Sequence, residues 1–143
     1  MDHLELARTM FNKTWELLDR DDRTDEDDRE MAAMALASRY HWRQAGEAKN
    51  HSISDWQVSR VFSVLGDAPM ALSFGKAALE VAMESELAPF YVGFGHEAVA
   101  RAAALAGDSA IRNDHLAKAR AQAEAVEDAE ERKMLTDDLE TIA

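Results

Sequence analysis

The sequence predicts an all-α protein of about seven helices, on the basis of three observations. Apolar residues recur at three- and four-residue steps almost throughout the chain, as Leu4, Ala7, Phe11 and Trp15 do near the N-terminus. No segment alternates apolar and polar residues between turn signals, so no strand is predicted. Helix breakers are few, since the 143 residues include only 6 Gly and 2 Pro. We therefore expect one helical domain, which this length suits.

The first two helices are expected to form a hairpin. Between them lies a polar segment, and Thr24 is expected to cap a second helix that runs from about Asp25 to Gln44. The acidic residues that follow Thr24 suit the positive end of the helix dipole. We expect this helix to end at Gly46 and the polar run after it.

The acidic segment between these helices partly matches a calcium-binding loop. Asp19, Asp21, Asp27 and Glu30 stand at offsets 1, 3, 9 and 12 of such a loop. Arg23 occupies offset 5, where its charge would repel the ion. We therefore expect a solvated connection here and no metal site.

The remaining helices are predicted from their start and stop signals. Hairpins are expected over residues 3–46, 54–86 and 89–126, followed by a capping helix over residues 128–142. Ser54 is expected to cap the third helix. Pro89 is expected in the first turn of the fifth helix, where its missing N–H has no partner to lose.

An internal repeat is indicated by two Gly-Asp dipeptides, one at residues 66–67 and the other at residues 107–108. In each, Gly is expected to end one helix and Asp to cap the next. Arg60 and Arg101 stand at matching positions before the two glycines. A helix, a Gly-containing turn and an Ala-rich helix, repeated after about 40 residues, is typical of stacked helical hairpins.

The segment from Trp56 to Val81 carries a family resemblance. Phe62, the turn at residues 66–67, Ala71 and Ala78 fall near the spacing of the tetratricopeptide repeat (TPR), and the chain here resembles that family. The resemblance implies an α-superhelix with a concave face that binds a peptide or protein. It implies no catalysis.

Composition limits the function classes. The net charge of −12 argues against nucleic acid and anionic membrane as partners, because phosphate groups are bound by clustered Lys and Arg. The chain has no Cys, and no signal peptide or membrane-spanning run is predicted, so we expect a cytoplasmic protein. Nucleotide-binding and hydrolase motifs are absent, and no cofactor or metal is expected.

A polar-aromatic group in the middle of the chain is one candidate binding site. Its members are Arg39, His41, Trp42, Asn50, Trp56, Gln57 and Arg60. If the second and third helices pack together, a cation–π-lined pocket for a carboxylate or a phosphate-bearing small molecule can form between them. The alternative is that both tryptophans belong to the core, with Arg stems covering their edges.

Glu97 and Arg101 form a second candidate, one helical turn apart on the fifth helix. The pair can orient a ligand or join an interhelical ion-pair network that reaches Arg60. A hydrolytic site would use Glu97 as base with His41 or His96, but no spacing in the sequence brings these groups together.

The function expected from these observations is that of an adaptor module, which binds a peptide or protein partner or forms a homodimer. Trp56, Arg60, Glu97 and Arg101 are expected to project into a groove between the third and fifth helices. The acidic charge favours a basic or neutral partner segment. The alternative is a small-molecule sensor or enzyme with a pocket around His41, Trp42, Trp56 and Arg60.

Overall fold

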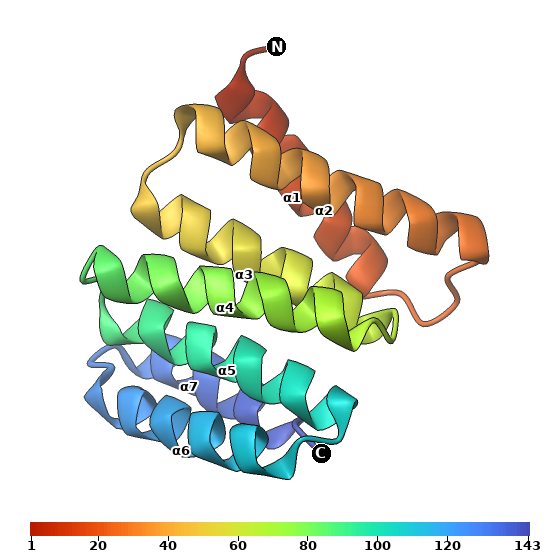
Figure 1. The fold of residues 1–143 in the computed structure, drawn as a ribbon. Helices are drawn as coiled ribbons and strands as arrows, with labels where there is room; N and C mark the ends of the chain where they lie inside the picture. Colours follow the sequence, from red (N-terminus) through yellow and green to blue (C-terminus); the bar gives the residue numbers. More distant parts are fainter.

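The computed structural model describes all 143 residues and contains seven α-helices and no strand, so the predicted all-α class is confirmed. The helices are α1 (His3–Leu18), α2 (Asp25–Ala45), α3 (Ala48–Val64), α4 (Ala68–Glu84), α5 (Pro89–Ala106), α6 (Ser109–Ala125) and α7 (Ala129–Glu140). They stack from the α1/α2 hairpin at one end to α6 and α7 at the other (Figure 1). No helix is long and apolar enough to cross a membrane.

Most helix starts agree with the sequence signals, with one exception. Thr24 caps α2 in a reciprocal capping box with Asp27, and Pro89 lies in the first turn of α5. The expected cap at Ser54 is wrong, because α3 begins well before it, after Glu47. There the side chains of Glu47 and Asn50 form the capping box, whereas Ser54 is buried inside the helix.

The two Gly-Asp turns have the same geometry. Gly66 and Gly107 adopt φ angles of +81° and +79°, a left-handed conformation that glycine enters without a Cβ clash. Asp67 and Asp108 then cap α4 and α6 by accepting the backbone N–H three residues later. The α3/α4 and α5/α6 hairpins therefore share one type of turn, as the repeat predicts.

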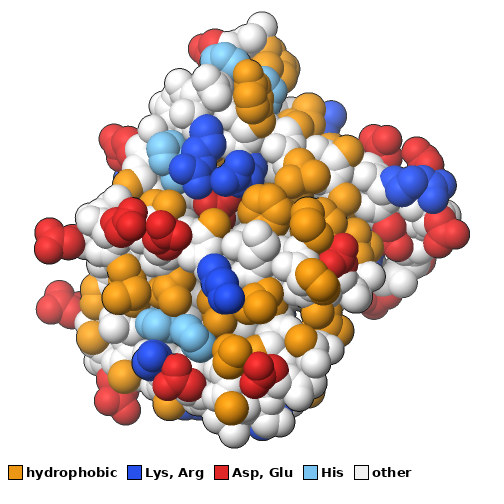
Figure 2. Space-filling model, in the orientation of Figure 1, with side chains coloured by type: hydrophobic (Ala, Val, Ile, Leu, Met, Phe, Trp, Pro, Cys, Tyr) orange, Lys and Arg blue, Asp and Glu red, His pale blue; other side chains and the backbone are white.

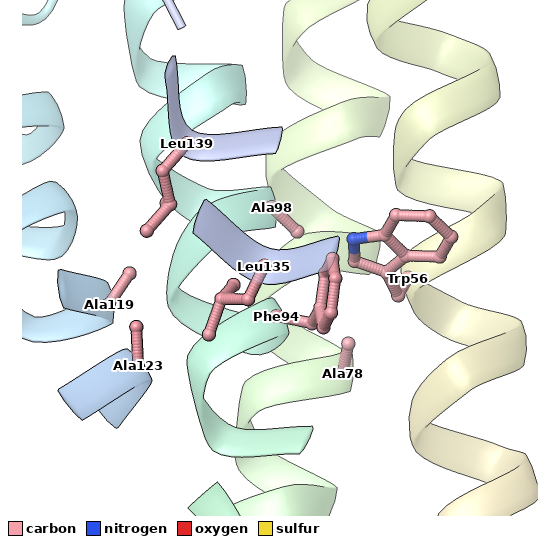
Figure 3. Packing of buried hydrophobic residues seen from close by; sticks show 8 residues of the cluster. All are labelled: Trp56, Ala78, Phe94, Ala98, Ala119, Ala123, Leu135 and Leu139. Carbon is pink, nitrogen blue, oxygen red and sulfur yellow. The ribbon is translucent and has the colours of Figure 1, made fainter. Parts of the chain in front are cut away.

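Small residues allow the middle helices to pack closely. A Cβ atom added to Gly95 would lie 2.8 Å from the Leu79 Cα atom, so α5 approaches the backbone of α4 directly at this point. The main apolar cluster extends from Trp56 through Phe94 to Leu135 and Leu139, as Figure 3 shows. It joins α3, α5 and α7 into one core.

The odd-numbered helices face one another along one side of the stack. α3 packs against α5, and α5 packs against α7, in addition to the contacts between neighbours in the chain. The opposite side, seen in Figure 2, carries interspersed basic, acidic and hydrophobic side chains. Acidic side chains gather at the α1–α2 connection, which accounts for part of the net charge of −12. The odd-numbered helices therefore form the inner side of the stack.

Candidate functional site

An apolar cleft of about 440 Å³ lies among α1, α3, α5 and α7. Its lining residues are Phe11, Trp15, Ile53, Trp56, Phe90, Phe94, Met134, Asp137 and Asp138. Seven of these nine are hydrophobic, two are acidic and none is basic. The volume lies in the range of ligand-binding pockets, about 300–1,000 Å³.

Aromatic rings form most of the cleft wall. The Trp56 ring lies 5.7 Å from the Trp15 ring and 5.4 Å from the Phe94 ring, the latter in an edge-to-face arrangement. Phe90 continues the series, 5.0 Å from Phe94. With Phe11, five of the ten aromatic residues in the chain line this one cleft.

Beneath the cleft lies a buried hydrogen-bond network centred on Glu97. The Trp56 indole N–H donates to Glu97 Oε2 at 2.9 Å. Arg60 and Arg101 both donate to Glu97 Oε1, each at 2.9 Å. The Glu97 side chain is 0% exposed, so its charge is held by these three donors rather than by water.

The network extends to α7 through Asp138. Arg60 donates to Asp138 Oδ2 at 3.0 Å, and Arg101 donates to the Asp138 carbonyl oxygen and to the Thr141 hydroxyl. Burial raises the pKa of Asp138 above its ordinary value, and the Arg60 guanidinium offsets part of that shift. With Glu97 and Asp138 opposite Arg60 and Arg101, the network contains equal numbers of acids and bases.

The four residues expected to project into a groove between α3 and α5 do come together, but they are not the exposed surface of a groove. Trp56 and Glu97 are buried, and Arg60 and Arg101 are mostly buried, because α7 packs against this side of α5. The expectation of open, projecting side chains is therefore wrong. The reason lies in α7, which the sequence places at the end of the stack and the structure places on its inner side.

The other predicted site residues are separated from this network. Arg39 and Arg43 both bind the fully buried carboxylate of Asp55, and the Arg39 guanidinium lies over the Phe74 ring. This pairing ties α2 to α3 near α4. It places Arg39 away from Trp56, so the pocket expected between α2 and α3 does not gather its two arginines.

Trp42 and Asn50 lie beside each other at Gly46, whereas His41 and Gln57 contact α1. His41 pairs with His3, with 2.8 Å between the two Nδ1 atoms. Trp42 is buried at the end of α2, and Asn50 accepts the Glu47 N–H in the capping box of α3. Gln57 is buried and donates to a backbone carbonyl of α1. The pocket expected around His41, Trp42, Trp56 and Arg60 is therefore not formed.

A second histidine pair joins α5 to α6. His96 Nδ1 lies 2.9 Å from His115 Nδ1. Burial, together with the charges of His115 and Lys118, lowers the pKa of His96 to about 4. Neither imidazole bonds to Glu97, whose oxygens are occupied by Trp56, Arg60 and Arg101. The acid–base pair that hydrolysis would need is not assembled, and no group of three or more metal-ligating side chains is present.

Most of the residues that line the cleft, including Trp15, Phe94 and Asp138, are not among the predicted site residues. A signal was present in the repeat spacing, because Trp15, Trp56, Glu97 and Asp138 follow one another at equal intervals in the chain. These equivalent positions on α1, α3, α5 and α7 meet in the structure, the rings by packing and the acids through Arg60. The spacing that predicted the repeat therefore also aligns the cleft with the network beneath it.

A scan against protein-family models, a search of curated proteins and a search of solved structures found no match to this chain.

Proposed function

We propose that this protein is a TPR-like interaction module that binds a peptide segment of a partner protein in the cleft among α1, α3, α5 and α7. The observation that carries the proposal is the cleft itself, an open concave surface to which four helices contribute apolar side chains. Such a surface accepts the side chains of an amphipathic segment.

The network beneath the cleft supports a binding role. It holds Trp56 by its indole N–H and anchors α7 through Asp138, so the cleft walls are fixed before a partner arrives. A surface that is ordered in advance loses little conformational entropy on binding. In the same network Glu97 is occupied by three donors and Asp138 is paired with Arg60, which favours binding over catalysis.

A display selection of random peptides on the wild-type protein tests the proposal, with two methionine variants to locate the binding. Met134, 57% exposed, lines the cleft, whereas Met83, 58% exposed on α4, does not. Removing the cleft methionine deletes apolar contact area, so Met134→Ala should weaken selected peptides about fivefold. Met83→Ala should leave their affinity unchanged.

Two results would contradict the proposal: a selection that returns no binding peptide, or peptides whose affinity responds equally to Met134→Ala and Met83→Ala. Sedimentation of the free protein distinguishes a partner from a second copy. A dimer that Met134→Ala dissociates would show that the cleft serves self-association instead.

A small apolar molecule is a second candidate occupant, because the volume of about 440 Å³ suits one ligand. A thermal-shift screen tests it. A compound that raises the melting temperature of the wild type and of Met83→Ala, but less that of Met134→Ala, would support this role.

A further inference from the structure

We infer that the cleft recognises a basic residue of the partner peptide, a Lys or Arg side chain inserted between the aromatic rings and the carboxylates of α7. This inference rests on the proposed function and specifies the chemistry of the partner. It is carried by the combination of five aromatic residues and two acids in a lining without any basic residue.

The aromatic wall suits a cation with an apolar stem. The face of an aromatic ring attracts an ammonium or guanidinium group within about 6 Å, and the alkyl stem of Lys or Arg packs against neighbouring rings. The chain already contains such a contact, since the Arg60 guanidinium lies 5.2 Å from the centre of the Trp56 ring. Phe11, Trp15 and Phe90 are only partly buried, so they remain accessible to a ligand.

The two acids make the cleft selective for a basic side chain. An apolar side chain of similar length would pack against the rings equally well but would gain nothing from the carboxylates. Arg60 binds Oδ2 of Asp138, which leaves Oδ1 for a ligand. The Asp138 carboxylate is more than half buried, so water screens its charge less than that of a surface acid. Asp137, next to it on α7, is 56% exposed and is held only by the exposed Lys133 at 2.5 Å. An incoming cation can compete for Asp137 because such an exposed pair is weak.

Arg60 already lies over the Trp56 ring and binds one oxygen of Asp138, but neither Arg60 nor Arg101 lines the cleft itself. Arg60 is shared between Glu97 and Asp138, and Arg101 is held by Glu97 and by the end of α7. Neither guanidinium is free to repel a ligand, because the network contains as many acids as bases. The net charge of −12 further favours the approach of a basic segment.

The chain provides a matched control for the role of Asp137. Asp114 on α6 is 55% exposed and forms an equivalent one-turn ion pair with Lys118 at 3.0 Å, and it does not line the cleft. Asp137→Asn and Asp114→Asn therefore remove the same charge from equally exposed carboxylates, one inside the cleft and one outside it.

The experiment uses the peptides recovered by display on the wild-type protein. We expect them to share a Lys or Arg next to an aromatic or aliphatic residue. Replacing that Lys or Arg by norleucine, which keeps an apolar stem without the charge, should weaken binding about tenfold as measured by fluorescence polarisation. Asp137→Asn should weaken the basic peptide about threefold to fivefold and leave the norleucine peptide unchanged, whereas Asp114→Asn should alter neither.

The outcomes separate this inference from the proposed function. Purely apolar or acidic peptides that respond to Met134→Ala would overturn the inference and leave the proposed function intact. Equal affinity of the basic and norleucine peptides, or equal effects of Asp137→Asn and Asp114→Asn, would do the same. An empty selection would overturn both.

Discussion

Replacing Glu97 by Gln tests whether the buried network stabilises the inner side of the fold. The substitution keeps the shape of the side chain and removes the charge that three donors share. If the amide oxygen of Gln faces Arg60 and Arg101, its NH₂ group meets the indole N–H of Trp56, donor against donor. One buried N–H then loses its partner, and two ion-pair hydrogen bonds become weaker bonds from a charged guanidinium to a neutral amide oxygen.

The expected loss follows from these changes. An unsatisfied buried donor costs about 1–3 kcal/mol, and each weakened guanidinium bond costs about 1 kcal/mol. Arg60 and Arg101 retain some exposure to water, at 17% and 18%, which reduces the second contribution. We expect Glu97→Gln to lower the free energy of unfolding by about 3 kcal/mol, or the melting temperature by about 10 °C for a domain of this size.

Urea denaturation followed by far-ultraviolet circular dichroism measures this loss. Glu80→Gln on the exposed face of α4 is the control and should change the free energy of unfolding by less than about 0.5 kcal/mol. Trp56→Phe removes the indole N–H together with part of the buried ring, and its coupling to Glu97→Gln in a double-mutant cycle separates the lost bond from the lost packing. If Glu97→Gln costs no more than Glu80→Gln, the network does not hold the fold and the reasoning is refuted.

Three further predictions concern the stability of α4, α5 and α6. The pKa of His96 is lowered to about 4 from 6.5, so the unfolded state binds more protons between these values. The free energy of unfolding should therefore fall as the pH drops from 6.5 to 4, and the accompanying decrease in urea midpoint should be smaller in His96→Gln. Gly95→Ala should destabilise by about 1–3 kcal/mol in thermal unfolding, because the new Cβ would meet the Leu79 backbone, and an unchanged midpoint would show that α4 and α5 can separate without cost. Asp67→Ala should cost about 1 kcal/mol by removing the cap of α4, with an equal cost expected for Asp108→Ala if the two turns are equivalent.

Helix positions were predictable because their signals are local. Thr24 caps α2 through a residue three positions away, and Gly66 ends α3 through its own backbone angle. Such features depend on a few neighbours in the chain, so the sequence contains them directly. The error at Ser54 has the same origin: a residue with cap chemistry lies inside α3, where its hydroxyl bonds the His51 carbonyl oxygen instead.

The cleft was not predictable in this way. A helix face that lines a cleft has the same periodicity as a face buried in the core, so Phe11 and Trp15 were indistinguishable from packing residues. Glu97 on α5 is joined to distant parts of the chain, because Trp56 lies on α3 and Arg60 connects it to α7. The i, i+4 bond to Arg101 and a network reaching Arg60 were expected from the sequence, whereas the link to Asp138 on α7 was not. The sequence does not indicate that α7 covers this pair, because this depends on how α7 packs against α5.

The repeat spacing explains why the apolar and charged parts of the site lie side by side. The equivalent positions on successive odd-numbered helices change from Trp15 and Trp56 to Glu97 and then Asp138, so the polarity rises along the stack while the position in the repeat is retained. An apolar surface therefore lies toward α1 and carboxylates lie toward α7. A peptide that binds here should bind in one direction. The reverse orientation would place its basic group against Phe11 and its apolar group against Asp137, which leaves a charge without a partner. If the proposed peptide binds in this cleft, its direction follows from the change from tryptophan to acidic residues at one repeated position.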